Sequence, residues 1–188
     1  MEEIIKQAIR TPSVVDPKTK MYLGGASSPG VDIKDAVALL KIHGIIATTE
    51  RYTSDSDDTR DPTVIDKELS VQALNDLKTA LAAGKATMVG VNNTALYKDF
   101  PHQDQPGQTP TANHQVVVIG YDTATDTVYI DDGGWPPDPQ DAGRPEGGKN
   151  MPVKLESFLA AWKADDYELT VAVRGKSPTT RVSNIPMR

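Results

Sequence analysis

Apolar residues recur at helical spacing in four stretches of the chain. The predicted helices cover residues 2–10, 33–43, 71–83 and 155–162. Asp32 and Ser70 stand at expected N-cap positions, and Gly44 and Gly84 stand where helices are expected to end. Shorter apolar runs predict strands over residues 45–52, 86–91, 116–119, 127–130 and 167–173. Because helices come first and strands cluster later, the pattern predicts an α+β fold with N-terminal helices packed on a mainly antiparallel sheet.

Three long connectors separate these elements, over residues 11–30, 92–113 and 133–151. The last contains four prolines and five glycines, and a loop of that length in a compact domain is usually functional or mobile. The length of the chain suits one domain with its own core. We therefore predict a single domain over residues 1–175, followed by a polar tail over residues 176–188.

Composition excludes several classes of function. The 188 residues carry a net charge of −6 at pH 7, whereas proteins that bind duplex nucleic acid usually present a concentrated basic face. No segment approaches the roughly 18 consecutive apolar residues that a membrane-spanning helix needs. The first residues lack a signal-peptide pattern, so the chain as written is expected in the cytoplasm, or outside the cell if a leader has been removed.

The chain contains no cysteine, which excludes disulfides, zinc–thiolate sites and thiol catalysis by these residues alone. The acidic run over residues 55–61 lacks the central glycine and terminal glutamate of a calcium-binding loop. His102, between Asp99 and Asp104, is only a weak candidate for a metal ligand. The sequence therefore predicts no metal and no cofactor.

One hairpin brings together residues that could perform chemistry. His114 precedes the apolar run over residues 116–119, and Asp131 and Asp132 follow the run over residues 127–130. In an antiparallel hairpin the start of the first strand lies beside the end of the second, so the histidine can meet an aspartate. A histidine oriented by a carboxylate is half of a nucleophilic triad, whose other member is a serine, threonine or cysteine.

Four segments give the chain a resemblance to a known family. They are VDIKDAVALLKIHGI, LKTALAAGKATMVGVN, NHQVVVIGYDTATDTVYIDDGG and VKLESFLAAW. In this order they resemble the papain-like cysteine peptidases, and more closely the bacterial branch related to bacteriocin-leader-processing peptidases, the C39-like domain. The resemblance runs from about Glu2 to Val173 and implies a papain-like fold.

The resemblance implies a role for several residues. His114 matches the general base of the family and Asp132 matches the residue that orients it, while strand alternation sends Asp131 to the opposite face. Asn113, Asp131 and Trp135 are candidates for contact with a substrate or partner. The family's oxyanion glutamine, nucleophilic cysteine and central helix would lie upstream of Glu2, so this chain lacks them.

Two functions remain open. The chain could belong to a cysteine peptidase that hydrolyses peptide amides only when a cysteine is supplied from outside these residues. Alternatively, it could be a pseudopeptidase that serves as a peptide-binding or protein-binding module. Without the central helix an apolar face of the sheet should be exposed, which predicts a homo-oligomer or a complementing chain.

Overall fold

The computed structural model describes residues 2–23, 31–98, 114–134 and 147–175. The chain divides into two compact units, one formed by residues 1–47 with 173–188 and the other by residues 48–172. The single domain predicted over residues 1–175 stays a prediction, and the predicted polar tail lies outside the described residues.

The described part of the smaller unit contains two helices, α1 (Glu2–Arg10) and α2 (Ile33–Ile42). Its small core is formed by the buried side chains of Ala8, Met21 and Leu39. Asp32 caps α2 as predicted, since its carboxylate accepts a hydrogen bond of 2.8 Å from the amide of Lys34. Gly44 follows the helix with a φ of +71°, a conformation that favours glycine.

A six-stranded sheet has the strand order β1-β6-β2-β3-β4-β5. Its strands are β1 (Ile45–Glu50), β2 (Ala86–Val91), β3 (His114–Asp122), β4 (Thr127–Asp131), β5 (Met151–Lys154) and β6 (Leu169–Arg174). The four pairings that join β6, β2, β3, β4 and β5 are all antiparallel. The predicted α+β class with a mainly antiparallel sheet is therefore confirmed.

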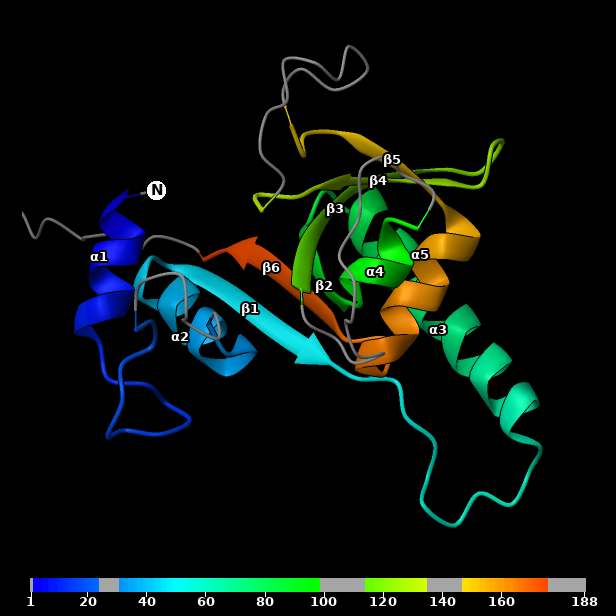
Figure 1. Ribbon diagram of the computed structural model, residues 1–188, viewed down its shortest axis with the longest axis horizontal. Helices are drawn as coiled ribbons and strands as arrows, with labels where there is room; N and C mark the ends of the chain where they lie inside the picture. The colour runs from blue at the N-terminus through cyan, green and yellow to red at the C-terminus, as the bar shows by residue number, and fades with distance from the viewer. Residues whose placement is uncertain (1, 24–30, 99–113, 135–146, 176–188) are drawn as a thin grey trace, which may run out of the picture. The chain divides into compact units, whose positions relative to one another are not determined.

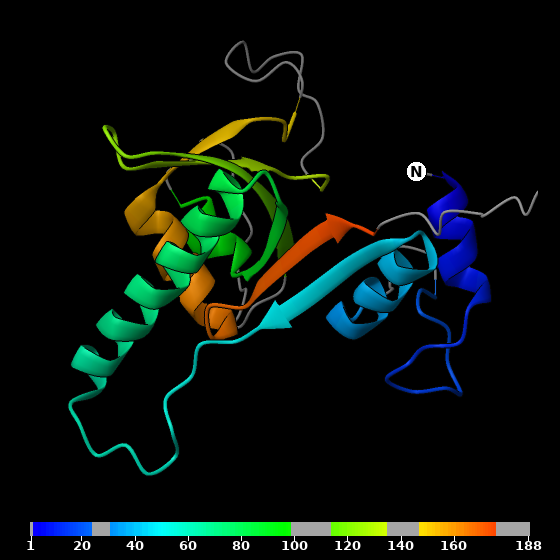
Figure 2. The same ribbon diagram turned by 180° about the vertical axis from the view of Figure 1, so that it is seen from behind.

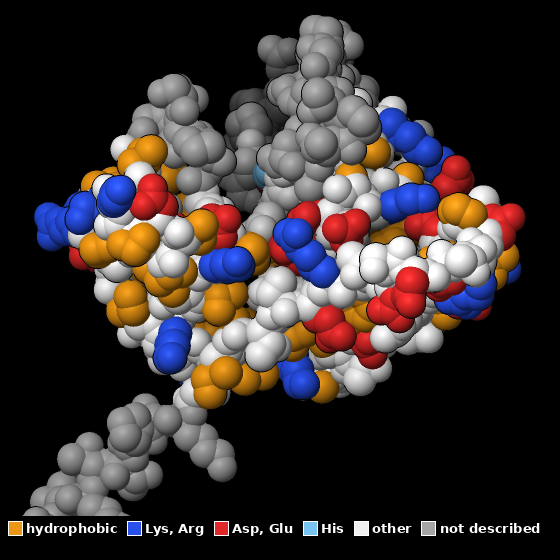
Figure 3. Space-filling model, turned by 90° about the horizontal axis from the view of Figure 1, so that it is seen from below, with side chains coloured by type: hydrophobic (Ala, Val, Ile, Leu, Met, Phe, Trp, Pro, Cys, Tyr) orange, Lys and Arg blue, Asp and Glu red, His pale blue; other side chains and the backbone are white. Residues whose placement is uncertain are grey.

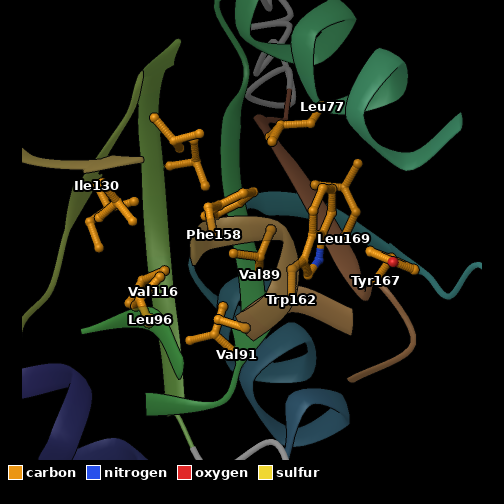
Figure 4. Packing of buried hydrophobic residues seen from close by; sticks show 14 of the residues in the cluster. Leu77, Val89, Val91, Leu96, Val116, Ile130, Phe158, Trp162, Tyr167 and Leu169 are labelled. Atoms are coloured by element: carbon orange, nitrogen blue, oxygen red, sulfur yellow. The ribbon is translucent and has the colours of Figure 1, made fainter. Parts of the chain in front are cut away.

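In the larger unit, helices pack on one face of the sheet (Figures 1 and 2). They are α3 (Pro62–Ala82), α4 (Asn93–Leu96) and α5 (Leu155–Trp162), and a short 3-10 helix, η1 (Lys163–Asp165), follows α5. Phe158 and Trp162 of α5 point toward the strands and pack among the apolar side chains that β2, β3 and β6 direct to this face (Figure 4). On the opposite face, Val117 and Ile119 keep 39% and 43% of their surface exposed.

Three local predictions need correction. α3 begins at Pro62 and not after Ser70, because Asp61 caps it by accepting a hydrogen bond of 2.8 Å from Thr63 and a proline suits the first turn. The connector predicted over residues 92–113 begins with the four-residue helix α4. A further strand, β5, lies between the predicted 133–151 loop and α5.

An ion pair with one buried partner joins Arg51, after β1, to Glu168, just before β6, within the larger unit. Glu168 is 1% exposed, and its Oε2 accepts hydrogen bonds of 2.9 and 2.7 Å from Nε and Nη2 of Arg51. Asp165 lies 3.2 Å from the same guanidinium. Burial and the nearby charge of Glu168 raise the pKa of Asp165.

Asp165 also lies directly over Gly90, the next-to-last residue of β2. A Cβ atom built on Gly90 would stand only 1.8 Å from Oδ2 of Asp165. No side chain can therefore occupy position 90 unless the carboxylate of Asp165 moves.

Charges on the larger unit are mixed in sign. On the face shown in Figure 3, Asp and Glu side chains are interspersed with Lys and Arg side chains over this unit. That face carries no concentrated basic patch of the kind that duplex nucleic acid requires. Among the described residues, no helix combines the length and the apolar character needed to span a membrane.

Candidate functional site

The ends of two paired strands bring His114 and Asp132 together. His114 is the first residue of β3, and Asp132 follows the last residue of β4. The antiparallel register pairs Val117 with Asp131, so the end of β4 runs alongside the start of β3. Nε2 of His114 lies 2.9 Å from Oδ2 of Asp132, and the two side chains are 25% and 3% exposed.

Asp132 forms three hydrogen bonds besides its contact with His114. The hydroxyl of Tyr97 donates to Oδ2, and the amide of Gly134 donates to Oδ1 over 2.7 Å. The backbone amide of Asp132 itself donates to the carbonyl of Gly148 over 2.7 Å. Both carboxylate oxygens of Asp132 and its backbone amide are therefore held by hydrogen bonds.

These contacts set the ionisation of Asp132. Burial alone would raise its pKa, but the contact with His114 and the hydrogen bonds from Tyr97 and Gly134 outweigh burial, so the pKa lies below the ordinary value of 3.8. The carboxylate is thus ionised at neutral pH.

The ionised carboxylate determines which nitrogen of His114 carries the proton. Two lone pairs facing each other at 2.9 Å would repel, so a neutral ring carries its proton on Nε2. The N–H at Nε2 does not point well at Oδ2. Nε2 is buried and forms no well-directed hydrogen bond to any described residue. Nδ1 is then the nitrogen that can accept a proton.

Gly134 closes one side of the pair. A Cβ atom at this position would lie 3.2 Å from both Cε1 of His114 and Oδ1 of Asp132. A larger residue would therefore push against the imidazole, the carboxylate or both.

The other predicted contact residues do not join the pair within the described part of the chain. Oδ1 of Asp131 accepts a hydrogen bond of 2.8 Å from the amide of Asn150, and its strand register places it beside the exposed Val117. Asn113 and Trp135 lie outside the described residues, as does His102. Among the residues that the structure does describe, no group of three or more acidic or histidine side chains is placed to hold a metal ion.

Sequence reasoning missed Tyr97. It follows a helix of only four residues, too short to show any apolar periodicity, and it is separated from Asp132 by 35 positions in the sequence. One local signal was present, because Asn92 is a good N-cap residue directly after the apolar strand β2.

The α+β fold and the His114–Asp132 pair together define a class: an α+β protein in which the imidazole of a histidine contacts a buried, ionised carboxylate. The family model of the Peptidase C39-like family matches residues 30–169. The chain belongs to this family, which confirms the resemblance seen in its sequence.

Relatives and a solved structure extend this comparison. Uncharacterised proteins of Mycobacterium tuberculosis and Mycobacterium bovis are each 27% identical to this chain over 165 residues, which cover 85% of the chain. The match spans 62% of the length of these relatives. A crystal structure from Bacillus anthracis, named as a C39-like peptidase, is 20% identical with a TM-score of 0.46, and the match covers 80% of this chain and 63% of that one.

The lowered pKa of Asp132 predicts how stability depends on pH. Its stabilising effect should be fully present above pH 3.8 and should be lost as the pH falls through the lower pKa of the folded state. Asp132→Asn should therefore cost about 1.5–3 kcal/mol at pH 7, the range for hydrogen bonds to a charged group. Urea unfolding of both proteins between pH 7 and pH 2 checks this prediction. A difference between their free energies of unfolding that stays constant below pH 3 would contradict it.

Proposed function

We propose that this chain provides the base half of a thiol-dependent peptide amidase, with His114 as general base and Asp132 as the residue that orients it. The observation that carries the proposal is the 2.9 Å contact between Nε2 of His114 and Oδ2 of a buried, ionised Asp132. Membership of the C39-like family supports the same reaction class. The nucleophile must come from outside these 188 residues, because they contain no cysteine.

In the proposed reaction, Nδ1 of His114 takes the proton of the cysteine thiol and leaves a thiolate. The thiolate attacks the carbonyl carbon of the peptide, the C–N bond breaks, and the imidazolium returns the proton to the leaving amine. Water then hydrolyses the thioester, with His114 as base again. Asp132 keeps the proton of the neutral ring on Nε2 and stabilises the imidazolium by its charge.

A second function is favoured by one observation, the absence of cysteine from the whole sequence. As a pseudopeptidase, the chain would bind a peptide or protein without cleaving it. Asn113, Asp131 and Trp135 are the proposed contact residues in either case. We further propose that the chain forms a homo-oligomer or pairs with a complementing chain, which in the peptidase would complete the site.

The decisive experiment uses the polypeptide translated from the complete reading frame. It should be incubated with an electrophilic peptide probe that alkylates an activated thiol, and the labelling rate should be measured by mass spectrometry. His114→Ala should lower that rate about 10²-fold or more, the usual contribution of a positioned general base. His43→Ala is the matched control, because His43 caps α2 in the smaller unit and should leave the rate unchanged.

Two results would contradict the peptidase proposal. One is a reading frame that encodes no cysteine, with no partner chain that restores labelling. The other is a labelled cysteine whose rate is the same in the His114→Ala protein. After either result the proposal of a binding module remains. Calorimetric titration of the 188-residue chain with peptides would then test it directly.

A further inference from the structure

We propose that Tyr97 is a positioning residue of the His114–Asp132 pair, acting through its hydroxyl on the carboxylate of Asp132. This role in a reaction rests on the function proposed above, but the physical effect of Tyr97 on the pair does not. Tyr97 is 1% exposed and its hydroxyl donates to Oδ2 of Asp132, the same oxygen that lies 2.9 Å from His114.

The structure holds Tyr97 in place from both ends of α4. Oδ1 of Asn92 accepts a hydrogen bond of 2.9 Å from the amide of Ala95, which caps the helix, and the amide of Asn92 donates to the carbonyl of Ala161 in α5 over 2.9 Å. At the other end, the amide of Tyr97 donates to the carbonyl of Asn93 over 3.1 Å. A helix of four residues, tied to α5, thus fixes the position from which the phenol reaches the carboxylate.

The distribution of donors over the carboxylate explains what Tyr97 does. Among the described residues, the amide of Gly134 is the donor that anchors Oδ1, and a carboxylate held at one oxygen can still rotate about its Cβ–Cγ bond. The hydroxyl of Tyr97 anchors Oδ2 and removes that freedom. Since His114 does not form a well-directed hydrogen bond, Tyr97 keeps Oδ2 beside Nε2.

A phenol suits this role for an electrostatic reason. It is a neutral donor near pH 7, so it orients the carboxylate without cancelling its charge. A lysine or arginine in its place would also donate, but its positive charge would weaken the attraction between the carboxylate and an imidazolium at His114. The full negative charge of Asp132 thus stays available to the histidine.

The test is made on the 188-residue chain by NMR. Tyr97→Phe should shift the carboxyl titration of Asp132 to higher pH, because one stabilising donor is lost. The imidazole nitrogen shifts of His114 should change from one dominant tautomer to a mixture. Tyr121→Phe is the matched control, since Tyr121 donates to Asp126 and not to Asp132; it should change neither signal.

An unchanged Asp132 titration and an unchanged His114 tautomer in a folded Tyr97→Phe protein would overturn the proposal and leave Tyr97 as a packing residue. If that variant does not fold, the wild-type protein gives the answer. The Cζ resonance of Tyr97 should then move with the ionisation of Asp132, and a flat Cζ signal through that transition would overturn the proposal. Neither measurement involves a thiol, so either can fail or succeed independently of the peptidase test.

Discussion

Trp162→Ala is expected to lower the free energy of unfolding by about 3–5 kcal/mol, the range found when a fully buried tryptophan is truncated. Trp162 is fully buried in the core of the larger unit (Figure 4). The centroid of its ring lies 5.2 Å from the ring centroid of Phe158 and 5.7 Å from that of Tyr167. Its indole nitrogen also donates to the carbonyl of Glu168 over 2.7 Å. The substitution therefore leaves a cavity and an unsatisfied buried carbonyl.

Urea unfolding followed by circular dichroism measures this loss. Trp162→Phe separates its two components, because phenylalanine retains much of the packing but cannot donate, and it should cost about 1–3 kcal/mol. Val71→Ala is the control, since Val71 is 52% exposed on α3, and it should change stability by no more than about 0.5 kcal/mol. A loss below 1 kcal/mol in Trp162→Ala would show that this core does not hold the larger unit together.

Arg51→Met should be the next most damaging change, at about 2–4 kcal/mol. Removing one partner of a buried ion pair leaves the other charge without compensation, and Glu168 would lose both of its hydrogen bonds from the guanidinium. We place the expected loss at the lower end of the usual range for buried pairs, because the side chain of Arg51 is 50% exposed and water can reach part of the site.

Two further variants make this prediction specific. Arg60→Met removes an arginine of similar exposure that pairs with Asp58 and Glu68, and it should cost clearly less than Arg51→Met because Glu68 lies at the surface, where ion pairs contribute little. Adding Glu168→Gln to Arg51→Met removes the charge of Glu168 that the first substitution leaves uncompensated. The second substitution should restore part of the loss, while Asp165 stays without the guanidinium. Equal losses in Arg51→Met and Arg60→Met, measured by urea unfolding, would contradict the prediction.

The parts of the fold that could be predicted are those with local signals. The β3–β4 hairpin is an example, because two apolar runs separated by a short turn define both the pairing and the meeting of His114 with Asp132. The alternation of side chains along β4 likewise predicts that Asp131 points away from the pair. The start of α3 also has a local signal, Asp61 followed by Pro62, but Ser70 is a competing N-cap residue within the same stretch.

The remaining features depend on contacts that no short pattern contains. Tyr97 reaches Asp132 across 35 positions in the sequence, and Arg51 reaches Glu168 across 117. α4 and β5 have four residues each, so neither shows a helical or strand period long enough to recognise. The histidine and its carboxylate could thus be predicted, whereas the residue that holds the carboxylate could not.

The carboxylate of Asp165 over Gly90 has a consequence for the history of the family. Because a Cβ atom at position 90 would overlap Oδ2 of Asp165, a substitution of Gly90 that leaves Asp165 in place must displace its carboxylate. A side chain at position 90 requires either that the carboxylate of Asp165 rotate away or that residue 165 become shorter, and either change disturbs one of the two acids beside Arg51. Positions 90 and 165 should therefore covary among relatives, although 75 positions separate them in the sequence.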